Sequence, residues 1–348
     1  MKYSVLIFIL FTFIFISCTP VTPSPTAIPT KSPAATETST PTEQSPQITA
    51  TPVQPDFPTA GDLALAHVDS ISNGIGSRPA GSEQDSQTVQ YIVKVFEKLR
   101  YPSQVQPFTV TVNGNTIQSV NVIAVKQGVS SQEIIVGAHY DSVKVGKGAD
   151  DNASGIGVML EVADRIKDKE TPYSIRFILF GAEEAGLQGS KYYVSQMTKE
   201  QKENTIAMIN LDSLTVGDMA YIYGDKGDGA LIRDWALAYA AKNGLTLQTQ
   251  PGENPKYPAG TTGDWSDHAP FKDAGIPYTY LESTNWTLGD KDGYTQVDPQ
   301  YGEDGEIWHT HYDTMEYINA TFPNRIQERL NLFVTLLEAI LTEFKLGS

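Results

Sequence analysis

The sequence has very little cysteine and fewer positive than negative charges. One cysteine, Cys18, occurs among its 348 residues. Because a single thiol cannot form a disulfide within the chain, the folded part must be stabilised by a hydrophobic core or by bound metal. Lys and Arg number 25 against 41 Asp and Glu, which gives a formal net charge of −16. This excess of negative charge argues against nucleic acid and against anionic membrane surfaces as partners.

The N-terminal segment resembles the signal peptide of a bacterial lipoprotein. A basic start and an apolar run over residues 5–16 precede Cys18. The run is short for a membrane-spanning helix, which needs ~20 apolar residues, but it suits a signal sequence. We expect residues 1–18 to be a signal peptide whose lipobox ends at Cys18, with Phe15 in place of the usual Leu. An ordinary signal peptide or an anchor helix is the alternative.

The next forty residues lack what a hydrophobic core requires. Residues 19–58 are mostly Thr, Pro, Ser, Ala and Gln, and Phe57 is their only aromatic residue. We expect a disordered, extended linker that separates residues 59–348 from the anchor. The anchor and linker together predict attachment to the extracellular face of a bacterial membrane through lipid at Cys18. Secretion is the alternative.

The region 59–348 alternates between strand and helix patterns. Ile134–Val136 and Ser174–Phe180 are typical of buried strands, and Ile156–Ile166 between them has helical apolar spacing. This order predicts a βαβ unit. Further strands are predicted at 105–112, 119–125, 204–210, 220–223 and 276–281, and further helices at 63–71, 88–101, 230–243 and 326–344. We therefore predict a single α/β domain with a mixed central β-sheet and helices on both faces.

Acidic residues and histidines follow the predicted strands, at the edge of the sheet where ligands bind. Those that recur there or in later motifs are His139, Asp141, Asp150, Asp151, Glu183, Glu184, Asp212, Asp267, His268, His309 and His311. So many carboxylates in one pocket repel one another, and one or two divalent cations relieve that repulsion. Histidine nitrogen and carboxylate oxygen, without cysteine, suit zinc or a similar first-row metal.

Six short blocks occur in a specific order along the chain. They are His139-x-Asp141, residues 148–155, residues 183–190, Leu211-Asp212, residues 266–268 and residues 309–314. Together they resemble the bacterial and fungal co-catalytic zinc aminopeptidases of the aminopeptidase Y and secreted leucyl aminopeptidase kind, from about Arg78 to the C-terminus. The resemblance implies a zinc exopeptidase-like fold, two Zn²⁺ per chain and a metallo-aminopeptidase that removes N-terminal residues from peptide substrates.

The resemblance also implies which residues bind metal. His139 and Asp212 correspond to ligands of one zinc, Glu184 and His309 to ligands of the other, and Asp151 to the bridging carboxylate. Asp150 becomes the bridge if the alignment is shifted by one residue. His311 is a competing ligand candidate.

The remaining roles concern catalysis and the substrate. Glu183 corresponds to the general base, which takes a proton from a water held between the metals and returns it to the leaving amine. Asp141 is expected to accept a hydrogen bond from the second ring nitrogen of His139 and so to fix its tautomer. Candidates for the substrate site are Asp267, His268 and His311, with a capped helix start as the alternative for the first two.

Other functions stay open on the sequence alone. A carboxypeptidase-like dipeptidase or another amidohydrolase on this fold needs a basic residue, such as Arg78, to hold a substrate carboxylate. A glutaminyl cyclase relative uses one metal, and the intact second ligand set argues against it. A non-catalytic binding lipoprotein that has lost its ligands holds no metal. Calcium near Asp290–Asp292 is a further candidate, and a monomer is favoured although the sequence does not decide the oligomeric state.

Overall fold

The computed structural model describes residues 59–112 and 114–347. The expected signal peptide with Cys18 and the expected linker at 19–58 lie outside the described residues. Among the helices that are described, none has the length and hydrophobicity that crossing a bilayer requires.

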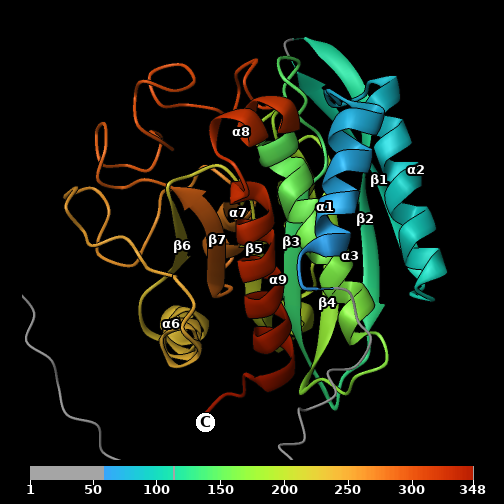
Figure 1. Cartoon of the computed structure of the whole chain (residues 1–348). Helices are drawn as coiled ribbons and strands as arrows, with labels where there is room; N and C mark the ends of the chain where they lie inside the picture. Colours follow the sequence, from blue (N-terminus) through green and yellow to red (C-terminus); the bar gives the residue numbers. More distant parts are fainter. Residues whose placement is uncertain (1–58, 113, 348) are drawn as a thin grey trace, which may run out of the picture. The chain divides into compact units, whose positions relative to one another are not determined.

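A mixed β-sheet runs through the described region in the order β1-β2-β4-β3-β5-β7-β6 (Figure 1). Its strands are β1 (Ser103–Val112), β2 (Asn115–Lys126), β3 (Ser130–His139), β4 (Tyr173–Phe180), β5 (Thr205–Leu211), β6 (Met219–Gly224) and β7 (Tyr278–Thr284). The neighbours β4, β3, β5 and β7 pair in parallel. The outer strands β1, β2 and β6 pair antiparallel. The predicted mixed sheet is confirmed.

Helices cover both faces of this sheet (Figure 1). They are α1 (Asp62–Asp69), α2 (Glu83–Lys98), α3 (Gly155–Ile166), α4 (Gln188–Gln196), α5 (Lys199–Asn204), α6 (Leu231–Asn243), α7 (His268–Asp273), α8 (Met315–Thr321) and α9 (Arg325–Glu343). One buried cluster joins α1, α2, α3, α6 and α9 to the sheet. A second cluster, with Phe271 and Tyr193 at its centre, joins α7 and α4 to the opposite face. The predicted single α/β domain is therefore confirmed for the described region.

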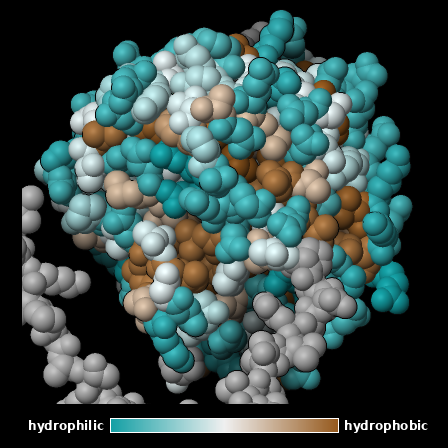
Figure 2. Space-filling model, viewed as in Figure 1, coloured by the Kyte–Doolittle hydropathy of each residue, from teal (hydrophilic) through white to brown (hydrophobic). Residues whose placement is uncertain are grey.

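Apolar residues at helical spacing explain why α3 and α9 form where the sequence predicts them. The face that carries α1, α2 and α9 presents mainly hydrophilic residues to solvent, with hydrophobic residues in smaller patches (Figure 2). The predicted boundaries differ from the observed ones by up to five residues, and the largest difference is at α2, which begins five residues before Thr88. The Ser82 hydroxyl accepts a hydrogen bond from the Asp85 amide at 3.1 Å and caps the helix there.

The order of the parallel strands determines where a ligand can bind. The chain passes from β3 to β4 on one side and then crosses to β5 on the other side of β3. A crevice forms outside the carboxyl ends of strands at such a change of direction. His139 ends β3, Asp212 follows β5, and Glu183 follows β4, so all three side chains meet at this edge.

Candidate metal centre

Two sets of ligand-type side chains that share Asp151 meet at the carboxyl edge of the sheet, and a third possible group joins His139, Glu183 and Glu184. His139, Asp151 and Asp212 form one set, and Asp151, Glu184 and His309 form the other. Within each set the nearest ligand atoms lie within 4.8 Å of one another. The structure therefore brings together all five residues that the sequence marked as metal ligands.

Asp151 belongs to both sets and offers one oxygen to each. Its Oδ1 lies 3.0 Å from His139 Nε2, and its Oδ2 lies 3.1 Å from His309 Nε2. His139 Nε2 is also 3.3 Å from Asp212 Oδ1, and His309 Nε2 is 3.1 Å from Glu184 Oε2. A carboxylate with one oxygen in each set has the geometry required of a bridge between two cations.

Asp150, the alternative bridge, faces away from both sets. Its Oδ1 accepts hydrogen bonds from the amide and hydroxyl of Thr215 at 2.7 and 2.8 Å and from the Val216 amide at 3.1 Å. Its Oδ2 accepts from Gln296 Nε2 at 2.8 Å. With both oxygens occupied by protein donors, Asp150 anchors its loop and does not enter either set.

The loop that carries Asp151 is held in place by Asp313. The Asp313 carboxylate accepts hydrogen bonds from the amides of Ala149, Asp150 and Asp151 at 2.9, 2.7 and 3.2 Å. Gly148, which precedes this run, has a φ of 55° in the left-handed region. A β-carbon at that position would lie 2.6 Å from the Asp151 carbonyl oxygen, so only glycine fits without displacement.

Asp141 orients His139, as expected, through its main-chain carbonyl. The ring Nδ1 lies 3.1 Å from the Asp141 carbonyl oxygen, whereas the nearest Asp141 carboxylate oxygen is 3.8 Å away. The carboxylate instead accepts hydrogen bonds from the amides of Glu183 and Glu184 at 3.0 and 3.3 Å. Asp141 therefore fixes the His139 ring through its carbonyl and the Glu183-Glu184 turn through its side chain.

Asp212 and Glu184, the carboxylates that each belong to only one of the two sets that share Asp151, are held in place by further hydrogen bonds. Asp212 Oδ2 accepts a hydrogen bond from the Ser266 hydroxyl at 2.7 Å, and that hydroxyl in turn accepts one from Asn210 Nδ2 at 2.7 Å. Glu184 Oε1 accepts from the Val143 amide at 3.0 Å, which leaves Oε2 facing His309. These partners orient the free carboxylate oxygens towards the centre of the site.

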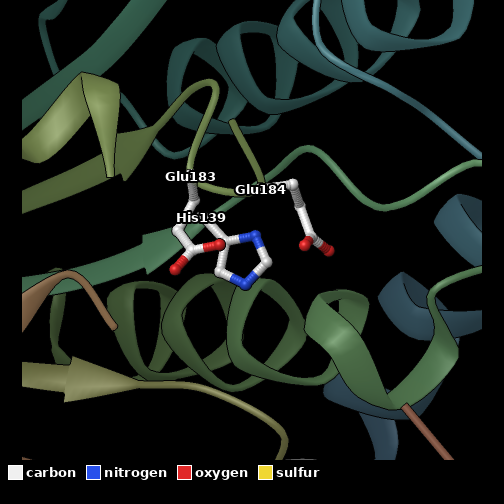
Figure 3. Close-up of side chains that lie close together, drawn as sticks. All are labelled: His139, Glu183 and Glu184. Atoms are coloured by element: carbon white, nitrogen blue, oxygen red, sulfur yellow. The ribbon is translucent and has the colours of Figure 1, made fainter. Parts of the chain in front are cut away.

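Glu183 lies at the site without a place in the His139–Asp212 or Glu184–His309 pairs. Figure 3 shows the carboxylates of Glu183 and Glu184 on opposite sides of the His139 ring. Burial raises the pKa of the Glu183 carboxyl well above its ordinary value, although the neighbouring His139 opposes this shift. A carboxylate that belongs to neither pair is free to accept and return a proton.

The pKa shifts of the candidate ligand side chains are those expected where a cation binds. Hydrogen bonds to Asp151 and Glu184 raise the pKa of His309 to about 11. Burial alone would raise the pKa of Asp151, but the hydrogen bonds from His139 and His309 outweigh it and lower that pKa below its ordinary range. Burial and the charge of Asp151 raise the pKa of Glu184 to about 7. A metal ion that binds here displaces the imidazole protons and supplies the positive charge that the carboxylates require.

A pocket of about 130 Å³ opens onto these ligand atoms. The buried residues His139, Asp151, Glu183 and Asp212 form its inner end, and the more exposed Trp265, Tyr294, Trp308 and Glu306 form its outer end.

Gln296 is a site residue that the sequence analysis missed. Its side-chain oxygen accepts hydrogen bonds from the amides of Ile307 and Trp308, both at 2.9 Å, and its Nε2 donates to Asp150. Gln296 thus ties the loop before His309 to the loop before Asp151. It lies in a long segment without strand or helix periodicity, so no sequence pattern identified it.

Arg78 does not face a bound substrate. It is completely buried, and its Nε donates to the Tyr140 carbonyl at 2.8 Å. Its terminal nitrogens donate to the carbonyls of Lys147 and Gly148 at 2.8 and 2.9 Å. Because the guanidinium is committed to the backbone of the metal-binding loops, the structure removes Arg78 as a partner for a substrate carboxylate.

The three residues suggested for the substrate site lie elsewhere. Asp267 and His268 are completely buried and are not among the residues that line the pocket. His268 Nε2 is 2.9 Å from the Gly263 carbonyl oxygen, and its ring packs against Tyr278 and Tyr280. Asp267 makes no side-chain hydrogen bond to cap α7. His311 is exposed, 3.6 Å from Glu303, and belongs to neither ligand set.

His268 makes the stability of the protein depend on acidity. Burial lowers its pKa from 6.5 to about 4, so the unfolded chain takes up a proton at a higher pH than the folded one. Its contribution to the free energy of unfolding is complete above pH 6.5 and is lost as the pH falls towards 4, by on the order of 3 kcal/mol. We expect the free energy of unfolding, measured with urea at pH 7, 5.5 and 4.5, to fall less with decreasing pH in His268→Gln than in the wild type. Equal losses in both proteins would contradict this prediction.

Fold and site together define an α/β enzyme whose candidate metal-binding side chains lie at the carboxyl ends of parallel strands. The sequence profile of peptidase family M28 matches residues 121–334, and the chain belongs to this family. It is a peptide hydrolase, as the motifs in the sequence predicted.

Individual relatives agree with this assignment. The chain is 36% identical over 308 residues to the alkaline phosphatase isozyme conversion protein of Escherichia coli (strain K12), which covers 80% of this chain and 89% of that protein. It is 33% identical to aminopeptidase YwaD of Bacillus subtilis (strain 168) over 65% of this chain and 46% of that protein, so it spans about half of that relative. The solved structure of BSAP, a zinc aminopeptidase from Bacillus subtilis, has the same fold, with a TM-score of 0.65 and 20% identity over 83% of this chain and 97% of that chain.

Proposed function

We propose that the protein is a zinc-dependent aminopeptidase with two metal sites per chain. The observation that carries the proposal is Asp151, which presents one oxygen to the His139–Asp212 pair and the other to the Glu184–His309 pair. The relative named as an aminopeptidase supports the choice of reaction, and the zinc aminopeptidase of the same fold supports the choice of metal.

In this proposal, five side chains bind the metal ions and Glu183 transfers a proton. When bound, the two zinc ions lower the pKa of water from 15.7 to ~7 and polarise the substrate carbonyl. Glu183 accepts the proton of the attacking water and delivers it to the leaving amine. Asp141 holds the Glu183 and Glu184 amides, so that the base and the ligand keep their different directions.

A free amino terminus suits the charge of this pocket. The charged side chains that line it are carboxylates and the histidines of the two sets, and neither lysine nor arginine occurs among the described lining residues. A carboxypeptidase or dipeptidase requires a cationic group for the substrate carboxylate, and Arg78 is not free for that role. The complete second ligand set favours the peptidase over a single-metal cyclase and over a binding protein without metal.

Two measurements test the proposal on the purified protein. Zinc analysis should give about two ions per chain. Aminoacyl p-nitroanilides with a free amine should be cleaved, and the same compounds with an acetylated amine should not. A zinc-loaded protein that cleaves neither series, or that cleaves the acetylated series equally well, would reject the aminopeptidase.

We also propose that the full-length chain is a lipoprotein attached through Cys18 to the outer face of the cell membrane. The argument rests on the sequence of residues 1–18. Cys18→Ser in the full chain should move the protein from the membrane fraction to the soluble fraction of a bacterial host, since the acceptor thiol is removed. Peptidase activity per molecule should stay the same. Unchanged membrane fractionation would contradict lipidation at Cys18.

A further inference from the structure

The outer end of the pocket combines one carboxylate with an aromatic wall. Glu306, Trp265, Tyr294 and Trp308 line it together. The rings contact one another, with centroids 5.3 Å apart for Trp265 and Tyr294 and 5.9 Å apart for Tyr294 and Trp308. Tyr294 is 45% exposed, so this wall is open to an incoming substrate rather than part of the sealed core.

Glu306 stands apart from the acidic residues of the two ligand sets. It is half-buried, and no hydrogen bond or ion pair to its carboxylate occurs among the described residues. Burial raises its pKa, while the nearby His309 opposes that shift. The contrast with Glu303 in the same loop is direct, because Glu303 is exposed, faces His311 at 3.6 Å and does not line the pocket.

The position of the aromatic wall matches the substrate geometry of an aminopeptidase. When the scissile carbonyl lies at the ligand atoms, the amino group and side chain of the first residue lie next to it and within reach of the other residues that line the same small pocket. A carboxylate without a protein partner attracts a cation there, and the faces of tryptophan and tyrosine add to the attraction when the cation is partly desolvated.

We propose that Glu306, with Trp265, Tyr294 and Trp308, binds the positively charged group of the substrate's first residue. This inference rests on the proposed aminopeptidase function and adds the residue that recognises the substrate. The shared chemistry is an organic cation, and two parts of the substrate can supply it: the α-ammonium group or a basic side chain. Glu306 acts on substrate binding and is not a metal ligand.

The test compares Glu306→Gln with wild type and with Glu303→Gln, each loaded with zinc. Glu303→Gln removes one negative charge from the same loop outside the pocket and therefore controls for long-range electrostatics. The substrates are the p-nitroanilides of leucine, norleucine and lysine; norleucine and lysine have side chains of similar length, but only lysine carries a side-chain cation. Zinc content and Tm are measured for all three proteins.

We expect Glu306→Gln to lower kcat/KM by about 10- to 100-fold, mainly through KM, the loss expected for a hydrogen bond to a charged group. An equal loss on all three substrates identifies the α-ammonium group, and a loss confined to lysine identifies the side chain. Zinc content should stay near two per chain, and Glu303→Gln should stay within about twofold of wild type.

Three results would overturn the inference. These are unchanged kcat/KM on every substrate in Glu306→Gln, an equal loss in Glu303→Gln, or loss of zinc in Glu306→Gln. Failure of the proposed function itself has a different signature, because the zinc-loaded wild type would then cleave none of the three substrates.

Discussion

Glu183→Gln is expected to keep both metals and to lower kcat by about 10²- to 10⁴-fold, the usual contribution of a general base. Glutamine keeps the size of the side chain and the main-chain hydrogen bond from residue 183 to Asp141, which is 3.0 Å long. It cannot accept the proton of the attacking water. Because Glu183 belongs to neither of the two sets that share Asp151, its replacement should leave zinc content unchanged.

Metal analysis and steady-state kinetics on one preparation check this prediction. Glu303→Gln is the matched control, since it makes the same chemical change at an exposed position outside the pocket. Its kcat should match wild type. A Glu183→Gln protein with normal turnover would remove Glu183 from the role of base, and one without zinc would show that Glu183 binds metal.

Asp151→Ala is expected to abolish activity and to weaken zinc binding by more than about 100-fold, beyond the 10- to 100-fold cost of losing a partner outside the ligand set. The change removes the oxygen 3.0 Å from His139 Nε2 and the oxygen 3.1 Å from His309 Nε2. Each remaining pair would then hold a cation with one imidazole and one carboxylate. Competition with a chromogenic chelator measures the loss at both sites.

Asp150→Asn is the matched comparison for Asp151→Ala. The Asp150 carboxylate accepts from Thr215, Val216 and Gln296. The asparagine side chain would place an NH₂ group, which can only donate, next to groups that also donate. We therefore expect the free energy of unfolding to fall by about 1–3 kcal/mol. Zinc should still bind at two ions per chain. The reverse pattern, with metal retained in Asp151→Ala and lost in Asp150→Asn, would move the bridge to Asp150.

Resemblance of short motifs identified the five metal-ligand candidates that the fold brings together, but not all of the residues that hold them in place. Asp141 lies at the second ring nitrogen of His139 as expected, but it does so through its main-chain carbonyl, because its carboxylate accepts hydrogen bonds from the amides of Glu183 and Glu184. Asp267 and His268 were placed near the substrate because they adjoin one another in a motif. The fold instead buries them behind the pocket, since α7 packs its apolar face on the sheet.

Three residues in or beside the pocket were not found from the sequence for a physical reason. Gln296, Glu306 and Trp308 lie in the connection between β7 and α8, which contains neither strand nor helix. In such a segment no periodic constraint relates neighbouring side chains to a common face. Their positions follow from hydrogen bonds between distant parts of the chain, such as Gln296 to Asp150.

The sequence by itself determined the α/β class, the family of the enzyme and the five residues that converge as metal-ligand candidates. Periodic apolar residues specify strands and helices locally, and parallel strands bring the residues after them to one edge. Only the tertiary structure decided that Asp151 rather than Asp150 faces both sets, that Arg78 is committed to backbone carbonyls, and that Glu306 faces the pocket. The direction of each side chain depends on the hydrogen-bond donors and acceptors that surround it in the folded protein. Adjacent residues of the same chemistry, such as Asp150 and Asp151, cannot be distinguished in this respect from the sequence alone.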